Sequence, residues 1–300
     1  MPLILQIAHG GGQCHPDATR ETVAPSSVSY PLYPRPRALS ESEIEDIITK
    51  FVQAVVRAKK AEFSGVQIHA AHGYLLAAFL SPHFNRRRDR WGGSTENRFR
   101  IVGEIIKRAR QQVGDFPIFI KISAHDGSKD GATVEESVRL SKMLQEAGYN
   151  AIEVSCGNSE FFNTIRVTTI PIQAILTFIP QYSRMPTLQK KLLALLAPLL
   201  IKKYQPLRNY NVEAAKKIKE QVTIPVIVVG GIRRLQDIEE IIINNKADYI
   251  SMCRPFIIEP DIVSKFLNGK QVESRCIDCG YCLMGIASTQ LKCYYGRVPK

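Results

Sequence analysis

Two histidines and a tyrosine lie close together just after a short apolar segment. His69 and His72 are three residues apart, Tyr74 follows two residues later, and residues 65–68 before them are typical of a buried strand. Three side chains that can donate a proton therefore meet where a strand gives way to a loop, which is where a β/α barrel carries its chemistry. A lone histidine there is usually structural, but this triple favours a catalytic site. A zinc protease would need a glutamate between helical histidines, whereas two alanines intervene here, so we expect no metal at this pair.

A second group of reactive residues lies near the C-terminus. Cys276, Cys279, Cys282 and Cys293 are spaced C-x2-C-x2-C-x10-C. In a cytosolic chain such spacing points to a metal rather than to disulfides. Four thiolates can hold a [4Fe–4S] cluster or a structural zinc. The residues alone leave three alternatives open, which are an iron–sulfur cluster, zinc and no metal.

Glycines and an arginine follow two consecutive predicted strands. Residues 224–229 are followed by Gly230 and Gly231, and residues 248–252 are followed closely by Arg254. This arrangement resembles the phosphate site of a TIM barrel. Glycines let backbone N–H groups approach a phosphate, and an arginine can bind its oxygens with two parallel hydrogen bonds.

Six apolar segments predict buried strands, and helical patterns between them predict a parallel sheet with helical crossovers. Ser40 and Glu43 form a capping-box pattern at the start of a helix. Residues 18–37 are rich in proline and serine and predict a loop. For the long excursion 157–209, with its apolar helix around 192–201, we expect a lid or a subunit contact; a membrane surface is the third alternative. The predicted strands are 2–7, 65–69, 117–123 (fully buried), 151–155, 224–229 and 248–252.

The length, composition and charge of the chain limit the classes of protein to which it can belong. The chain has 300 residues, of which 45% are hydrophobic, enough for one large α/β domain. No stretch reaches the roughly 18 consecutive apolar residues of a membrane span, and no secretory signal is visible, so we expect a cytoplasmic protein. The net charge of +12 is scattered, without a basic stripe interleaved with aromatic residues. This distribution argues against nucleic-acid binding and fits a solvated surface with some basic residues serving phosphate or anionic substrates.

The segment from His69 to Arg98 carries a long and specific resemblance. Its sequence, HAAHGYLLAAFLSPHFNRRRDRWGGSTENR, resembles the signature of the old yellow enzyme family, the FMN-dependent ene-reductases and their 2,4-dienoyl-CoA reductase relatives. The similarity extends over nearly the whole chain. It implies a TIM (β/α)8-type barrel that binds FMN, takes electrons from NADH or NADPH, and acts on a small-molecule enone or enoyl substrate.

The resemblance also implies roles for single residues. Gln6 matches the glutamine that hydrogen-bonds the flavin pyrimidine ring, and Lys121 matches a cation that stabilises negative charge at the flavin N1–O2 locus. His69 and His72 would bind the substrate carbonyl oxygen, and Tyr74 would protonate the α-carbon. The positions matching the FMN phosphate site are Gly230, Gly231 and Arg254.

The same resemblance indicates how this chain departs from the family. The family has eight barrel strands, and its first two strand–helix units have no counterpart here, so we expect an incomplete, N-terminally truncated barrel over residues 1–270. Residues 271–300 form an extension whose cysteines resemble the iron–sulfur motif of the dienoyl-CoA reductase branch, with one residue fewer between the second and third cysteines.

The expected function is transfer of hydride from NAD(P)H through FMN to the C=C bond of an α,β-unsaturated carbonyl substrate. Two alternatives stand beside it. The chain could be a truncated, non-catalytic remnant, or an electron-transfer or scaffold subunit that carries a cysteine-bound metal. A homo-oligomer or an electron-donor partner is compatible with each of these functions.

Overall fold

The computed structural model describes residues 2–14, 18–30, 33–158, 168, 171–200, 207–286 and 290–297. These residues belong to two compact units. The sheet unit comprises Met1–Thr164, Asn211–Val229 and Ile241–Ile250, and the cysteine unit comprises Ile165–Tyr210, Gly230–Glu240 and Ser251–Lys300. The boundaries of these two units differ from those of the predicted domains. The predicted division into a barrel domain (1–270) and an extension (271–300) stays a prediction.

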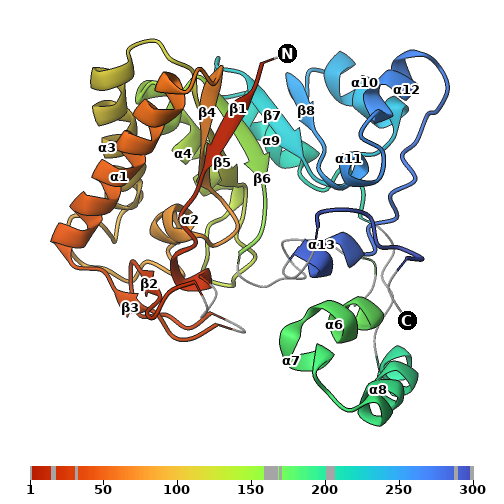
Figure 1. The fold of residues 1–300 in the computed structure, drawn as a ribbon. Helices are drawn as coiled ribbons and strands as arrows, with labels where there is room; N and C mark the ends of the chain where they lie inside the picture. Colours follow the sequence, from red (N-terminus) through yellow and green to blue (C-terminus); the bar gives the residue numbers. More distant parts are fainter. Residues whose placement is uncertain are drawn as a thin grey trace. The chain divides into compact units, whose positions relative to one another are not determined.

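A six-stranded sheet has the strand order β1-β4-β5-β6-β7-β8 (Figure 1). The neighbours from β1 to β7 pair in parallel. All six predicted strands are confirmed, and a parallel sheet of this size with helical crossovers is an incomplete TIM barrel, as expected. The strands are β1 (Ile4–Ile7), β4 (Gly65–Ala70), β5 (Ile118–Ser123), β6 (Ala151–Ser155), β7 (Val226–Val229) and β8 (Tyr249–Ser251).

Side chains of the central strands alternate between an apolar face and a polar face. On β5, Ile118, Ile120 and Ile122 are fully buried, whereas Lys121 and Ser123 on the other face are only half-buried. The prediction that 117–123 is buried throughout is therefore wrong for alternate residues. Figure 1 shows the long helices α1 (Glu41–Lys60) and α3 (Thr95–Val113) on one side of the sheet. The polar face is the opposite one, because side chains of a strand alternate.

Most of the remaining elements are short. Within the predicted loop 18–37, the structure has a two-residue strand, β2, which pairs in parallel with β3 just at the end of that loop. These elements are η1 (Gly11–Gln13), β2 (Val23–Ala24), β3 (Arg37–Ala38), α2 (Leu75–Leu80), α4 (Val134–Glu146), α6 (Ile172–Phe178), α7 (Pro180–Ser183), α8 (Thr187–Leu200), α9 (Val212–Lys219), α10 (Leu235–Ile243), α11 (Arg254–Ile258), α12 (Ile262–Leu267) and α13 (Tyr281–Ile286).

The predicted capping box at the start of α1 is confirmed. The backbone N–H of Glu43 donates to Ser40 Oγ over 3.3 Å, and the backbone N–H of Ser40 donates to Glu43 Oε2 over 2.7 Å. We expect Ser40→Ala to lower the free energy of unfolding by about 1 kcal/mol, because it leaves a first-turn N–H without its acceptor. Urea titration followed by the fluorescence of Trp91, the single, buried tryptophan, measures the loss. Ser40→Asp keeps an acceptor and should restore stability; an unchanged Ser40→Ala midpoint would contradict the expectation.

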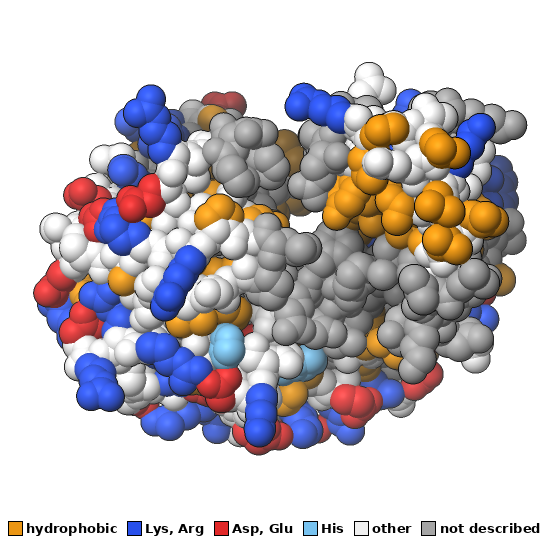
Figure 2. All heavy atoms as spheres, turned by 90° about the horizontal axis from the view of Figure 1, so that it is seen from below, with side chains coloured by type: hydrophobic (Ala, Val, Ile, Leu, Met, Phe, Trp, Pro, Cys, Tyr) orange, Lys and Arg blue, Asp and Glu red, His pale blue; other side chains and the backbone are white. Residues whose placement is uncertain are grey.

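The described parts of the excursion 157–209 include α6, α7 and α8. On α8, Leu188, Leu192, Leu195 and Leu196 recur at helical spacing, and all four are exposed. Figure 2 shows hydrophobic side chains gathered into a patch on the face that it presents. Among the described residues, no helix is both long and apolar enough to span a bilayer. The role of this segment as a lid or a subunit contact stays a prediction.

Candidate active site

The structure brings together the three rings at the end of β4. The ring centroids of His69 and His72 are 5.1 Å apart, edge to face, and those of His69 and Tyr74 are 5.0 Å apart. Strand β4 positions His69, and Tyr74 is the N-cap residue of α2. The rings converge because the chain leaves the strand and enters the helix within five residues.

Backbone contacts fix the position of His72 between the strand and the helix. Its φ of 63° is left-handed, an uncommon conformation for a residue with a side chain. Its N–H donates to Ser123 Oγ over 3.0 Å, and its carbonyl oxygen accepts from Gln13 Nε2 over 2.7 Å. These bonds hold the turn between β5 and η1, so its unusual backbone is supported from both sides.

Both imidazoles are neutral at neutral pH. Burial and the nearby Lys121 ammonium lower the pKa of His69 to about 4. Burial, together with His69 and Lys121, lowers the pKa of His72 to about 3. The backbone N–H of Ala71 donates to His69 Nδ1 over 3.2 Å, so the ring proton of His69 is on Nε2. His72 Nε2 lies 2.7 Å from Ser155 Oγ, which leaves Nδ1 as the other polar atom of that ring.

A polar row crosses the sheet beside these rings. Lys121 is the register neighbour of His69 on one side and of Glu153 on the other. Lys121 Nζ lies 3.2 Å from Glu153 Oε1. Gln67 Nε2 donates to Glu153 Oε2 over 2.7 Å, and Gln6 Nε2 donates to Gln67 Oε1 over 2.5 Å. Gln6 and Lys121 were predicted from the sequence, whereas Gln67 and Glu153 were not.

The alternation of each strand could have revealed the missed residues. The segments GVQIHA, IFIKIS and AIEVS each place polar residues at every second position. Because successive side chains point to opposite faces, this period puts the polar residues on one face. The residues found this way are Gln67, Ser123, Glu153 and Ser155.

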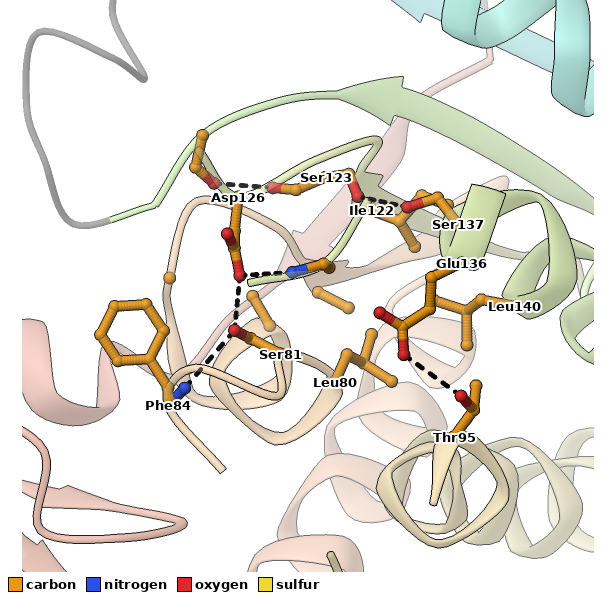
Figure 3. Close-up of a pocket in the computed structure, with 15 residues that line it drawn as sticks. Leu80, Ser81, Phe84, Thr95, Ile122, Ser123, Asp126, Glu136, Ser137 and Leu140 are labelled. Carbon is orange, nitrogen blue, oxygen red and sulfur yellow. Dashed lines mark hydrogen bonds between the residues drawn. The ribbon is translucent and has the colours of Figure 1, made fainter. Parts of the chain in front are cut away.

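A cavity in the sheet unit carries carboxylates, but both are already engaged (Figure 3). Asp126 accepts from Ser81 Oγ over 2.5 Å and from the N–H groups of Ser128 and Ala132 over 2.9 Å each. Glu136 is paired with Arg98 and also accepts from a threonine hydroxyl. Hydrogen-bonded carboxylates of this kind hold loops and helices together, so we assign the cavity a structural role.

The predicted phosphate residues lie in the cysteine unit. Gly230 and Gly231 have φ angles of 138° and 71°, which favour glycine. A Cβ on Gly231 would lie 2.4 Å from the carbonyl oxygen of Leu207, so the chain itself approaches this glycine closely. Arg254 Nη1 lies 3.3 Å from Asp278 Oδ1. The assignment of these residues to a phosphate therefore stays a prediction.

All four C-terminal cysteines line one pocket in the cysteine unit, together with Arg254 and Asp278. Burial raises the pKa of Cys276 to about 12 and that of Cys282 to about 11. Within the described part of the chain, no three candidate ligands come close enough together to hold a metal ion. The arrangement thus does not fit a metal centre as it stands, and the iron–sulfur or zinc assignment stays a prediction.

A family model identifies the chain. The NADH:flavin oxidoreductase / NADH oxidase family matches residues 2–169 and 183–273. The chain belongs to this family. It is the old yellow enzyme family that the histidine segment predicts, so that prediction is confirmed.

Curated relatives of the family match in sequence. NADH oxidase of Thermoanaerobacter brockii is 39% identical over 288 residues, covering 94% of this chain and 39% of that protein. NADPH dehydrogenase of Geobacillus sp. (strain WCH70) is 33% identical over 257 residues, covering 85% of this chain and 63% of that protein. The chain therefore spans less than two-thirds of the length of these relatives.

Two solved structures show the same fold. 2-Naphthoyl-CoA reductase, in complex with 2-naphthoyl-CoA, superposes with a TM-score of 0.76 at 24% identity, covering 96% of this chain and 41% of that one. The old yellow enzyme homologue from Zymomonas mobilis gives a TM-score of 0.69 at 21% identity, covering 100% of this chain and 74% of that one. At such identities the likeness establishes the fold alone.

The polar face of the sheet fits the cofactor that gives the family its chemistry. This face combines the amide of exposed Gln6 with the ammonium of Lys121. Glu153 Oε1 is buried and makes its contact through the ion pair alone, so Lys121 is held at one position by charge. An amide and a cation on one face suit the imide edge and the polar carbonyl of an isoalloxazine ring.

Proposed function

We propose that this chain forms the FMN-binding, substrate-reducing part of an NAD(P)H-dependent oxidoreductase that reduces the C=C bond of an α,β-unsaturated carbonyl compound. The observation that carries this proposal is the pair of neutral imidazoles grouped with Tyr74 and next to Lys121. FMN, when bound, supplies hydride transfer between the nicotinamide and the substrate. Gln6 and Lys121, both in the sheet unit, would hold its pyrimidine edge.

The histidines would act as neutral hydrogen-bond donors. His69 carries its proton on Nε2 because Nδ1 accepts from the backbone of Ala71. A neutral imidazole can donate to a carbonyl oxygen and stabilise the negative charge that develops on it as an enolate forms. His72 would add a second donor through the nitrogen that Ser155 does not occupy.

Tyr74 is placed to deliver the proton. Its ring lies beside His69 at the start of α2, and its side chain is partly exposed. A phenol so placed could protonate the α-carbon once the enolate is stabilised by the imidazoles. The histidines would then donate hydrogen bonds to the substrate oxygen, and the tyrosine would donate a proton to the α-carbon.

A half-reaction experiment tests the proposal. FMN-loaded protein is reduced anaerobically with NADH and then mixed with cyclohexenone, and the return of flavin absorbance is followed. A His69→Ala, His72→Ala double variant should reoxidise more slowly by roughly 10²–10³-fold, the effect of losing oxyanion donors. His83→Ala, a histidine on the loop after α2 and bonded to Asp130, is the matched control. Equal rates in the double variant and the wild type would overturn the proposal.

A second function is favoured by one observation, the shared pocket of the four cysteines. An electron-transfer or scaffold subunit would carry a metal there, in place of ene-reductase activity, although no three candidate ligands among the described residues are close enough together in this structure to hold one. Iron and zinc analysis of the purified protein, with and without Cys276→Ser, separates the two functions. Stoichiometric metal in a protein without ene-reductase activity would support the second function.

A further inference from the structure

Four side chains of the sheet unit form one continuous polar row. It runs from Gln6 on the edge strand β1, through Gln67 on β4, to the Glu153 carboxylate on β6, which pairs with Lys121 on β5. The side chain of Glu153 is 6% exposed, and that of Lys121 is 16% exposed. A carboxylate so deeply buried is stable only when it is paired and hydrogen-bonded, as it is here.

The row has a fixed direction because a carboxylate can only accept. Glu153 Oε2 must therefore face the Nε2 amide of Gln67, which turns Gln67 Oε1 toward β1. Gln67 Oε1 in turn requires the Nε2 end of Gln6. Because Nε2 of exposed Gln6 donates to the row, the amide keeps its carbonyl oxygen, Oε1, as the acceptor for another partner. Without the Glu153 carboxylate, the side-chain amide of Gln67 or Gln6 could rotate by 180° and exchange the positions of its Nε2 and Oε1 atoms.

We propose that Glu153 is a positioning residue for the flavin, acting in two directions. Through Gln67 it fixes Gln6 as a hydrogen-bond acceptor, and through its ion pair it fixes the Lys121 ammonium. The face then offers one acceptor and one cation, the complement of a ring edge that carries an N–H group and a carbonyl oxygen. This inference rests on the proposed function and names the recognised part of the cofactor, which is the N3–H of the flavin imide.

The test compares FMN with N3-methyl-FMN, whose imide nitrogen has no hydrogen. Dissociation constants are measured by quenching of flavin fluorescence. The wild type should prefer FMN by about tenfold, because a fixed Gln6 Oε1 is left without a donor beside the methyl group. Glu153→Gln and Gln67→Met should reduce the preference to about threefold or less, because a loosened Gln6 can turn away.

Two further variants separate positioning from folding. Glu153→Asp retains an acceptor-only carboxylate and should keep the preference, whereas Gln6→Met, on an exposed edge position, should abolish it. Trp91 fluorescence confirms that each variant is folded. A wild type that binds neither flavin would overturn the proposed function. A wild type that binds both flavins equally, or a Glu153→Gln variant that keeps the full preference, would overturn this inference alone.

Discussion

Acidification from pH 7 to pH 4 should destabilise the sheet unit by about 3 kcal/mol more in the wild type than in a His69→Asn variant. The pKa of His69 is lowered to about 4 in the folded protein, by burial and by Lys121, against about 6.5 for an unfolded histidine. Between these values the unfolded chain binds a proton that the folded chain does not bind. Stability is therefore fully present above pH 6.5 and is lost as the pH falls toward 4.

Asparagine is the replacement of choice because its side-chain oxygen can accept from the Ala71 N–H in place of Nδ1. Urea titrations at several pH values, followed by Trp91 fluorescence, give the difference. His72, whose pKa is lowered to about 3, should add a loss of the same sign, so a His69→Asn, His72→Asn double variant should be the least sensitive to acid. Parallel pH profiles for all three proteins would show that the imidazoles are not buried as the structure has them.

Local patterns predicted the elements and the ring cluster correctly. The six strands follow from short apolar segments, and the start of α1 follows from Ser40 and Glu43, which interact across one turn. The grouping of His69, His72 and Tyr74 is local as well, since six residues span a strand end and a helix start. Such contacts depend on backbone geometry over a few residues, which the sequence specifies directly.

The partners in the polar row depend on strand register instead. Gln67 and Glu153 are 86 residues apart and meet because β4 and β6 flank β5. No local pattern selects one glutamate to pair with Lys121. The alternation of the strands would have placed these residues on the same face, but the register that sets their distances comes only from the assembled sheet.

The cysteines show what the spacing of residues in the sequence cannot predict. Their spacing predicted a metal site, which the structure does not support, although the four cysteines do line one pocket. Spacing in an irregular segment does not set the distances between sulfur atoms, which depend on the backbone path from Cys276 to α13 and onward to Cys293. A cluster site needs four sulfurs within bonding reach of one centre, a condition that sequence spacing cannot establish.

Arg98→Met should cost the sheet unit about 3–5 kcal/mol, a large share of the stability of an ordinary domain. The guanidinium of Arg98 is buried and pairs with Glu136, joining α3 to α4. It also donates to the carbonyl oxygens of Leu80, over 2.9 Å, and Gly93. Removal of Arg98 leaves the half-buried Glu136 carboxylate without its cation and two carbonyl oxygens without this donor, and methionine restores only the apolar volume.

The chain offers a matched control for this ion pair. Arg139 on α4 pairs with Glu96 on α3, so this ion pair joins the same two helices with the arginine and the glutamate exchanged. Both of its side chains are at least half exposed. Arg139→Met should therefore cost less than about 1 kcal/mol. Urea midpoints by Trp91 fluorescence compare the two variants. Equal losses would mean that Arg98 is solvated in solution, contrary to its burial.

The Arg98 variant also connects stability with the site. Leu80 is the last residue of α2, and that helix begins directly after Tyr74. The bond from Arg98 thus holds the far end of the short helix whose first turn positions the tyrosine. We expect Arg98→Met to loosen α2 before it unfolds the sheet, so that protease cleavage near residues 75–80 should rise at urea concentrations where Trp91 fluorescence is still native. Cleavage that rises only together with the fluorescence change would show instead that α2 and the sheet unfold as one unit.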